Sequence, residues 1–230
     1  MLASTPGLVL HATPYSESSV VVKVFTRLFG VRSFIIKGVR GHGSRVKQNM
    51  LQPLSSLDMV VYINSRGSLN HVKEISPRNP GAMPDAVGNA LRFFKTEVLY
   101  KALHEDEPMP ELFDYVEKAD GNRSDEPILF LLTVTRHLGI EPLDNHSIRE
   151  PLFDLQEGRY VSSSSETTLT PALSSMLHDY LESLSSRQQP PAAPLSVRRN
   201  LIDALIAYYQ LHLSGFRNFN SHEILHTVLR

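Results

Sequence analysis

The sequence predicts an α+β protein, with a five-stranded β-barrel in residues 1–80 and an all-helical domain in residues 81–230. Up to residue 75, short runs of Val, Ile, Phe and Leu are separated by turn residues, as in a series of strands. Beyond Pro84, apolar residues recur at three- and four-residue steps, as on the buried face of a helix. The charge changes at the same place. Residues 1–80 hold ten Lys and Arg against three Asp and Glu, whereas residues 81–230 hold thirteen against twenty-one.

The N-terminal strands are expected at residues 8–10, 20–25, 31–36, 59–63 and 69–72. In the second of these, Val20, Val22 and Val24 share one face because side chains alternate along a strand, so Lys23 points to the other face. A five-stranded module with one basic face fits the OB-fold, a partly open barrel that commonly binds single-stranded nucleic acid. A small SH3-like barrel would give the same pattern.

In the C-terminal part, helices are expected at residues 90–103, 112–116, 128–138, 174–184, 197–213 and from 221 onward. Gly139 is a normal stop for the third helix and Gly215 for the fifth, and Ser196 and Ser221 are suitable N-caps for the last two. A small hairpin is expected at 153–161, with Gly158 in its turn. The acidic groups at 105–107 and 125–126 are flanked by proline, so we expect them at solvated helix boundaries rather than in a catalytic pair.

A forty-residue stretch from Ser18 to Leu57 contains no acidic side chain but seven basic ones. A clustered positive field attracts polyanions by releasing their counterions, and nucleic acid is the commonest polyanion that a soluble protein meets. The candidate DNA-binding residues are therefore Lys23, Arg27, Arg32, Lys37, Arg40, Arg45 and Lys47. The alternative is a solvated strand face that an acidic neighbour balances. The glycine-rich loop from Lys37 to Lys47 lacks the Gly-Lys-Ser/Thr ending of a P-loop, which argues against nucleotide triphosphate binding.

The composition excludes several kinds of site. Because the chain has no Cys, it has no disulfide, thiolate zinc site, iron–sulfur cluster or cysteine nucleophile. No apolar run approaches the roughly 20 residues that span a bilayer, and the first residues do not form a secretory signal. We therefore expect a soluble protein of the cytoplasm.

One motif carries enzymatic chemistry. His222, Glu223 and His226 match H-E-x-x-H, in which two imidazoles on one helical face hold zinc and the Glu acts as general base. A zinc-dependent hydrolase is therefore the alternative hypothesis. It is weakened because the usual third ligand lies further along the chain, where this sequence has only residues 227–230. We expect instead a structural helix in which Ile224 and Leu225 pack and the histidines sit at the rim.

Several short pieces, taken in order, resemble the RecO family of bacterial DNA repair and recombination mediators. The N-terminal pieces are Gly7-Leu8-Val9-Leu10, Tyr15-Ser16-Glu17-Ser18, Phe25-Thr26, Gly30, Lys37-Gly38-Val39-Arg40 and Leu51-Gln52-Pro53. The C-terminal pieces are Phe130 to Pro142, Tyr208-Tyr209-Gln210-Leu211-His212, Gly215-Phe216 and Ser221 to Leu225. Many members of the family have a four-cysteine zinc site after the central helix. This chain reads Leu143 to Leu155 there without any Cys, so we expect local packing to hold that region in place of a metal.

The resemblance implies a bacterial, nucleoid-associated protein without catalytic residues, metal or cofactor. Such a protein binds single- and double-stranded DNA, anneals complementary strands and helps RecA displace single-strand-binding protein. The implied partners are RecR, RecF, RecA and the acidic tail of single-strand-binding protein, which would dock in the helical domain. Arg198 and Arg199 are candidates for contacting that tail, and the alternative is that both are merely solvated.

Overall fold

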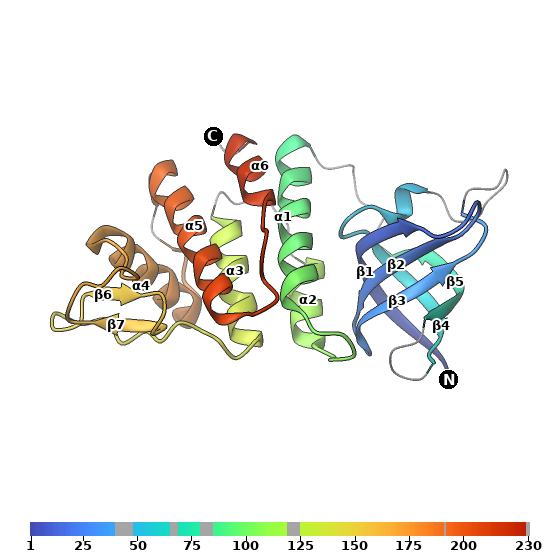
Figure 1. Cartoon of the computed structure of the whole chain (residues 1–230), viewed down its shortest axis with the longest axis horizontal. Coiled ribbons are helices and arrows are strands. Elements are labelled where there is room, and N and C mark those ends of the chain that lie inside the picture. The colour runs from blue at the N-terminus through green and yellow to red at the C-terminus, as the bar shows by residue number, and fades with distance from the viewer. Residues whose placement is uncertain (40–47, 65–68, 79–84, 119–124, 191, 229–230) are drawn as a thin grey trace. The chain divides into compact units, whose positions relative to one another are not determined.

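The N-terminal strands close into a barrel. The computed structural model describes residues 1–39, 48–64, 69–78, 85–118, 125–190 and 192–228. The strands are β1 (Leu2–Pro14), β2 (Val20–Thr26), β3 (Gly30–Ile36), β4 (Ser56–Tyr62) and β5 (Asn70–Pro77), and a short 3-10 turn η1 (Gln48–Leu51) lies between β3 and β4. They are arranged in the order β1-β2-β3-β5-β4, and β4 pairs back onto β1 (Figure 1). This order confirms the predicted five-stranded barrel.

The barrel core follows the alternation that the sequence predicts. Val22 and Val24 of β2 are fully buried, and they pack with Phe34 of β3 and with Met59 and Val61 of β4. All strand pairs are antiparallel except β3 and β5, which run parallel and pair only through Phe34 with Asn70 and Ile35 with His71. The described part of β3 before Phe34 therefore has one edge that β5 does not cover.

By their contacts, the residues group into two compact units, which differ from the expected division at residue 80. The first unit comprises 1–85 and 96–120, and the second comprises 86–95 and 121–230. Helix α1 (Ala86–Ala102) contributes to both, whereas α2 (Pro110–Lys118) belongs to the barrel unit. The physical reason is packing: Phe113 of α2 is fully buried, and its ring meets that of Phe25 of β2 edge-on at 5.5 Å between centroids.

The second unit is built around one central helix. Its elements are α3 (Glu126–His137), β6 (Leu152–Asp154), β7 (Arg159–Val161), α4 (Pro171–Ser186), α5 (Leu195–His212) and α6 (Ser221–Val228). Helix α3 is almost wholly buried, as its continuous apolar run predicts, and the hydroxyl of Tyr209 on α5 donates a 2.7 Å hydrogen bond to the carbonyl of Leu131. Gly139 lies just beyond α3 with a left-handed φ of +71°, which confirms the predicted stop.

Two details of the predicted helices are wrong. Ser196 does not cap α5, because the helix already begins at Leu195 and Pro194 occupies the N-cap position. Helix α5 ends at His212, and the next residue, Leu213, is extended, so the helix stops before Gly215.

In the described residues, no helix is long and apolar enough to cross a membrane.

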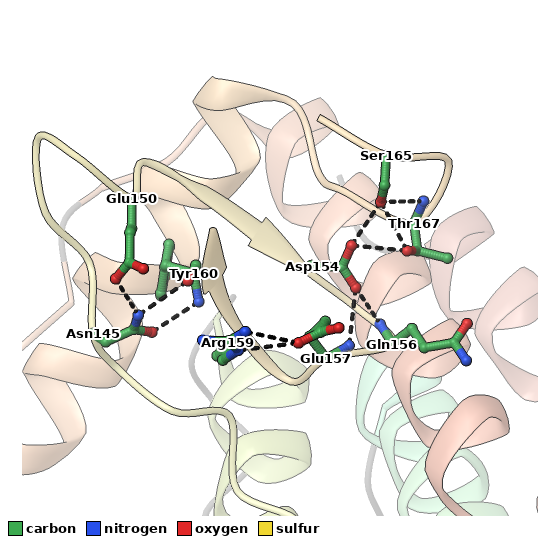
Figure 2. A network of polar contacts seen from close by, with 9 residues as sticks. All are labelled: Asn145, Glu150, Asp154, Gln156, Glu157, Arg159, Tyr160, Ser165 and Thr167. Atoms are coloured by element: carbon green, nitrogen blue, oxygen red, sulfur yellow. Dashed lines mark hydrogen bonds and ion pairs between the residues drawn. The ribbon is translucent and has the colours of Figure 1, made fainter. Parts of the chain in front are cut away.

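A polar network holds the β6–β7 hairpin, which lies where predicted. The buried carboxylate of Asp154 accepts hydrogen bonds from the backbone N–H groups of Gln156 and Glu157 at 2.9 Å each. It also accepts bonds from the hydroxyls of Ser165 at 2.6 Å and Thr167 at 2.9 Å (Figure 2). Burial alone would raise the pKa of Asp154, but these four hydrogen bonds together hold it below its usual range.

A second set of hydrogen bonds, also drawn in Figure 2, joins the segment before β6 to β7. The side chain of Asn145 accepts a 2.8 Å bond from the N–H of Tyr160 and donates a 3.0 Å bond to its carbonyl. The same amide donates to Glu150 at 2.8 Å. Backbone and side chains thus hold residues 145–167 together, in agreement with the expectation that local packing organises this region.

Replacing the carboxylate of Asp154 should make the protein less stable in a pH-dependent way. A group whose pKa is lower in the folded state contributes stability above its unfolded pKa of about 3.9, and that stability is lost as the pH falls through the folded pKa. We expect Asp154→Asn to lower the free energy of unfolding by about 1–3 kcal/mol at neutral pH. The difference from wild type should shrink below about pH 4. Urea unfolding followed by circular dichroism from pH 3 to pH 7 measures both effects. A difference that is independent of pH would show that the carboxylate charge is not what Asp154 contributes.

Candidate nucleic-acid interface

Four of the seven predicted DNA-binding residues lie among the described residues. Lys23 is on β2, Arg27 follows it in the turn, Arg32 is on β3, and Lys37 comes directly after β3. Arg40, Arg45 and Lys47 lie outside the described residues. Lys23 is opposite Ser33 on the outer face of the barrel, as its place in the alternation predicts. Arg32 is opposite Val24 and therefore belongs to the inward-facing series, at the end of the barrel.

Three of these cations are paired with carboxylates of one segment. Lys23 Nζ lies 3.1 Å from Glu105 Oε1, and Arg32 Nε lies 3.0 Å from Asp106 Oδ1. Arg27 forms a two-pronged pair with Asp114, in which Nε and Nη2 donate to the two carboxylate oxygens at 2.7 and 2.9 Å. The hydrogen bonds from Arg27 lower the pKa of Asp114. We call residues 105–117 the acidic segment, because they hold six Asp and Glu and no Lys or Arg.

The pairs differ in how exposed they are to solvent. The side chains of Arg32 and Asp106 are each 15% exposed, so this pair is largely shielded from water. Arg27 and Asp114 are 40% and 37% exposed, and Glu105 is 57% exposed beside a Lys23 that is 22% exposed. Water and salt screen exposed pairs. The pairs Lys23–Glu105 and Arg27–Asp114 therefore contribute little to stability and can exchange partners readily.

Backbone contacts seat the acidic segment against the uncovered edge of β3. The N–H of Asp106 donates to the carbonyl of Val31 at 3.1 Å, and Glu105 forms a parallel bridge with Val31. Gly30 makes this approach possible. A Cβ at Gly30 would lie 2.2 Å from the carbonyl oxygen of Glu107, and the residue has a φ of +65° that favours glycine. The segment is therefore fitted to the barrel through backbone as well as through charge.

Arg78, which was not among the predicted residues, extends the same set of contacts. Its Nη1 lies 2.8 Å from Asp58 Oδ1, and its Nε lies 2.9 Å from Glu117 Oε1. The hydroxyl of Ser56 donates to Glu117 at 2.6 Å. The expectation that the acidic groups at 105–107 and 125–126 sit at solvated helix boundaries holds for Glu105, which is 57% exposed just after α1. It is wrong for Asp106, which Arg32 shields from water, and for Glu126, which is buried against Lys95.

The net charge of the barrel unit depends on whether the acidic segment is counted with it. Counted over residues 1–80, the barrel carries a net charge of +7. Counted over the compact unit, residues 1–85 and 96–120, it holds twelve Lys and Arg against twelve Asp and Glu and is formally neutral. The acidic neighbour considered as the alternative for the basic stretch is thus present, and it is part of the barrel unit itself.

Lys37 is the exception among the described members of the set. It is exposed and forms no ion pair with another described residue. The next residues turn sharply: Gly38 has a φ of +73°, and the N–H of Val39 donates to the carbonyl of Ser18 at 2.9 Å. Val39 is buried, so the chain is anchored at the point where it enters residues 40–47. Lys37 is therefore an exposed cation three residues before Arg40.

The H-E-x-x-H motif lies on α6, where its members have structural contacts. His226 Nε2 lies 2.7 Å from Asp203 Oδ1 of α5, and the ring of His222 stacks on that of Phe219 at 5.6 Å between centroids. Among the described residues, no group of three or more His, Cys, Asp and Glu is arranged to hold a metal ion. Leu225 is fully buried as expected, but Ile224 is 57% exposed and the prediction that it packs is wrong.

The comparisons with known proteins agree with one another. Residues 1–80 match the family described as "Recombination protein O N terminal". Over its whole length the chain is similar to proteins named "DNA repair protein RecO". That of Flavobacterium psychrophilum is 26% identical over 237 residues, and that of Christiangramia forsetii is 26% identical over 239 residues. That of Flavobacterium johnsoniae is 27% identical over 237 residues. Each alignment covers 99% of both chains.

The fit between Gly30 and the acidic segment can be tested with a matched pair of variants. Gly30 and Gly38 both have positive φ values, so alanine is strained at either position, but a Cβ at Gly38 meets nothing within 4 Å. We expect Gly30→Ala to lower the free energy of unfolding by about 2 kcal/mol more than Gly38→Ala does, because only the first forces backbone apart. Chemical denaturation of both variants measures the difference. Equal losses would mean that left-handed strain alone accounts for Gly30.

Proposed function

Because this chain belongs to the RecO family, we propose that it acts in DNA repair and recombination by binding single- and double-stranded DNA and annealing complementary strands. In the same proposal it helps RecA to load onto DNA that is coated with single-strand-binding protein. The observation that carries the proposal is the closed five-stranded barrel over the residues that match the family, joined to full-length similarity with proteins named for DNA repair.

The proposed DNA contacts are to phosphates, so sequence preference should be slight. All seven basic residues of the predicted set remain part of the proposed interface, but their surroundings divide them. Lys37 is exposed and lies next to Arg40, Arg45 and Lys47 in sequence, so this group is proposed to make the first contacts. Lys23, Arg27 and Arg32 already have carboxylate partners, and their use by DNA requires an exchange of partners.

The proposed protein partners are RecR, RecF, RecA and the acidic tail of single-strand-binding protein. For the tail, the second unit offers Arg198 and Arg199 at the start of α5. Arg199 Nη2 donates to the backbone carbonyl of His226 on α6, so this side chain already helps to hold the terminal helix. Arg198 is therefore the better of the two candidates for an acidic tail.

The phosphate contacts are tested by the salt dependence of DNA binding. Each phosphate contact that is removed should flatten the slope of log K against log salt by about 0.7 for single-stranded DNA. We expect Lys37→Ala to lower the slope by about that amount, and Lys37→Ala with Arg40→Ala by about twice as much. Fluorescence anisotropy with a labelled oligothymidylate over a salt series measures it.

Lys73→Ala is the matched control, because Lys73 is another partly exposed lysine of the barrel unit and lies on β5, outside the predicted set. Its slope should equal that of the wild type. If Lys37→Ala leaves both affinity and slope unchanged, the assignment of Lys37 is wrong. Annealing of complementary strands, with and without single-strand-binding protein, then tests the activity itself.

A further inference from the structure

We propose that the acidic segment is an internal competitor for DNA: Glu105 and Asp114 occupy Lys23 and Arg27 in the free protein, and DNA phosphates replace them on binding. This inference rests on the proposed function and adds a masked part to its interface. The inference follows from the position of the two carboxylates. Both belong to the acidic segment, which holds six Asp and Glu and no Lys or Arg, and both contact cations of the barrel.

The chemistry of the two partners is interchangeable. A carboxylate and a phosphate both present two oxygens to the planar fork of an arginine, and the pair between Arg27 and Asp114 already has this two-pronged geometry. Lys23 holds its ammonium 3.1 Å from Glu105 and 4.7 Å from the ring centre of Tyr100. The Tyr100 contact does not depend on the carboxylate, so Lys23 can keep its position while its anionic partner changes.

The exposure of the pairs decides which of them can exchange. Glu105 and Asp114 are 57% and 37% exposed, so they can turn into solvent at little cost. The side chains of Arg32 and Asp106 are each only 15% exposed, and separating them would leave two poorly solvated charges. We therefore assign Lys23 and Arg27 to the exchangeable site. Arg32 stays paired with Asp106 as the anchor, so this inference withdraws it from the direct phosphate contacts proposed above.

The anchor allows the exchange to occur without unfolding. Phe113 is fully buried against Phe25, and the backbone of residues 105–107 is fitted to Val31 and Gly30. When the outer carboxylates turn away, these contacts keep the acidic segment on the barrel. The freed carboxylates then stand beside the bound DNA and weaken its binding, so the masked site favours a polymer with many phosphates over a single phosphate ion.

The test removes the competing charge but keeps the shape of the side chains. We expect Glu105→Gln with Asp114→Asn to bind a labelled oligothymidylate about threefold to tenfold more tightly than wild type at low salt. The control is Glu17→Gln with Glu74→Gln, which removes two negative charges from the same unit at exposed positions not paired with Lys23 or Arg27. It corrects for the general gain in affinity that comes with a more positive net charge.

Two further variants make the test specific. Adding Lys23→Ala and Arg27→Ala to Glu105→Gln with Asp114→Asn should remove the gain, because the unmasked cations are then absent. If the double variant does not fold, Glu105→Gln alone carries the test, since that side chain is the most exposed of the four. Thermal melting of each variant checks folding.

The outcomes separate this inference from the proposed function. If Glu105→Gln with Asp114→Asn binds no more tightly than the Glu17→Gln, Glu74→Gln control while wild type binds DNA through Lys37, the masking is wrong and the proposed function stands. If neither wild type nor any variant binds the oligonucleotide at low salt, the proposed function fails and the masking fails with it. Inorganic phosphate at the concentration of the oligonucleotide phosphates should not compete.

Discussion

The attachment of the acidic segment to the barrel determines which charges of the first unit are available. Its stability comes mainly from apolar burial, since Phe25 and Phe113 are both fully buried where their rings meet. Its position comes from the shielded pair of Arg32 and Asp106 and from the bond between the Asp106 N–H and Val31. A shielded pair contributes modestly to stability when it is complete, but the loss of either partner is costly. The contact therefore specifies one arrangement of the segment.

Because of this contact, a stretch that is basic in sequence does not form an equally basic surface. Residues 18–57 contain seven cations and no acid, yet three of the four described cations are neutralised by residues more than 70 positions further along the chain. Lys37 is exposed and forms no ion pair with another described residue; it lies just before Gly38, where the chain turns, and Val39, whose N–H bonds to Ser18. The long-range pairing leaves Lys37 as the exposed cation among the described members of the basic stretch.

The second unit shows how buried polar groups organise a helical domain whose sequence contains no Cys. Lys95 and Glu126 form a 2.6 Å pair in which both side chains are nearly buried, and Asp154 satisfies four donors around the β6–β7 hairpin. His226 is similarly paired with Asp203 of α5, and the ring of His222 stacks on Phe219, so both histidines of the apparent metallopeptidase motif have structural contacts. The spacing of histidines on a helix predicts that they share a face, but their partners decide what they do there.

The sequence by itself determined the α+β class, the five strands, the central helix and the hairpin at 153–161, because period-2 and period-3.6 patterns and glycine stops are local properties. It also contained the family resemblance that the comparisons bear out. The start and end of α5 were missed, since Pro194 and the extended Leu213 override the nearby Ser and Gly signals. The tertiary structure alone decided that residues 96–120 belong with the barrel and that Glu105, Asp106 and Asp114 neutralise its cations. Opposite charges in two parts of a sequence indicate that they attract each other, but only the folded chain brings particular atoms to within 3 Å, where a pair forms.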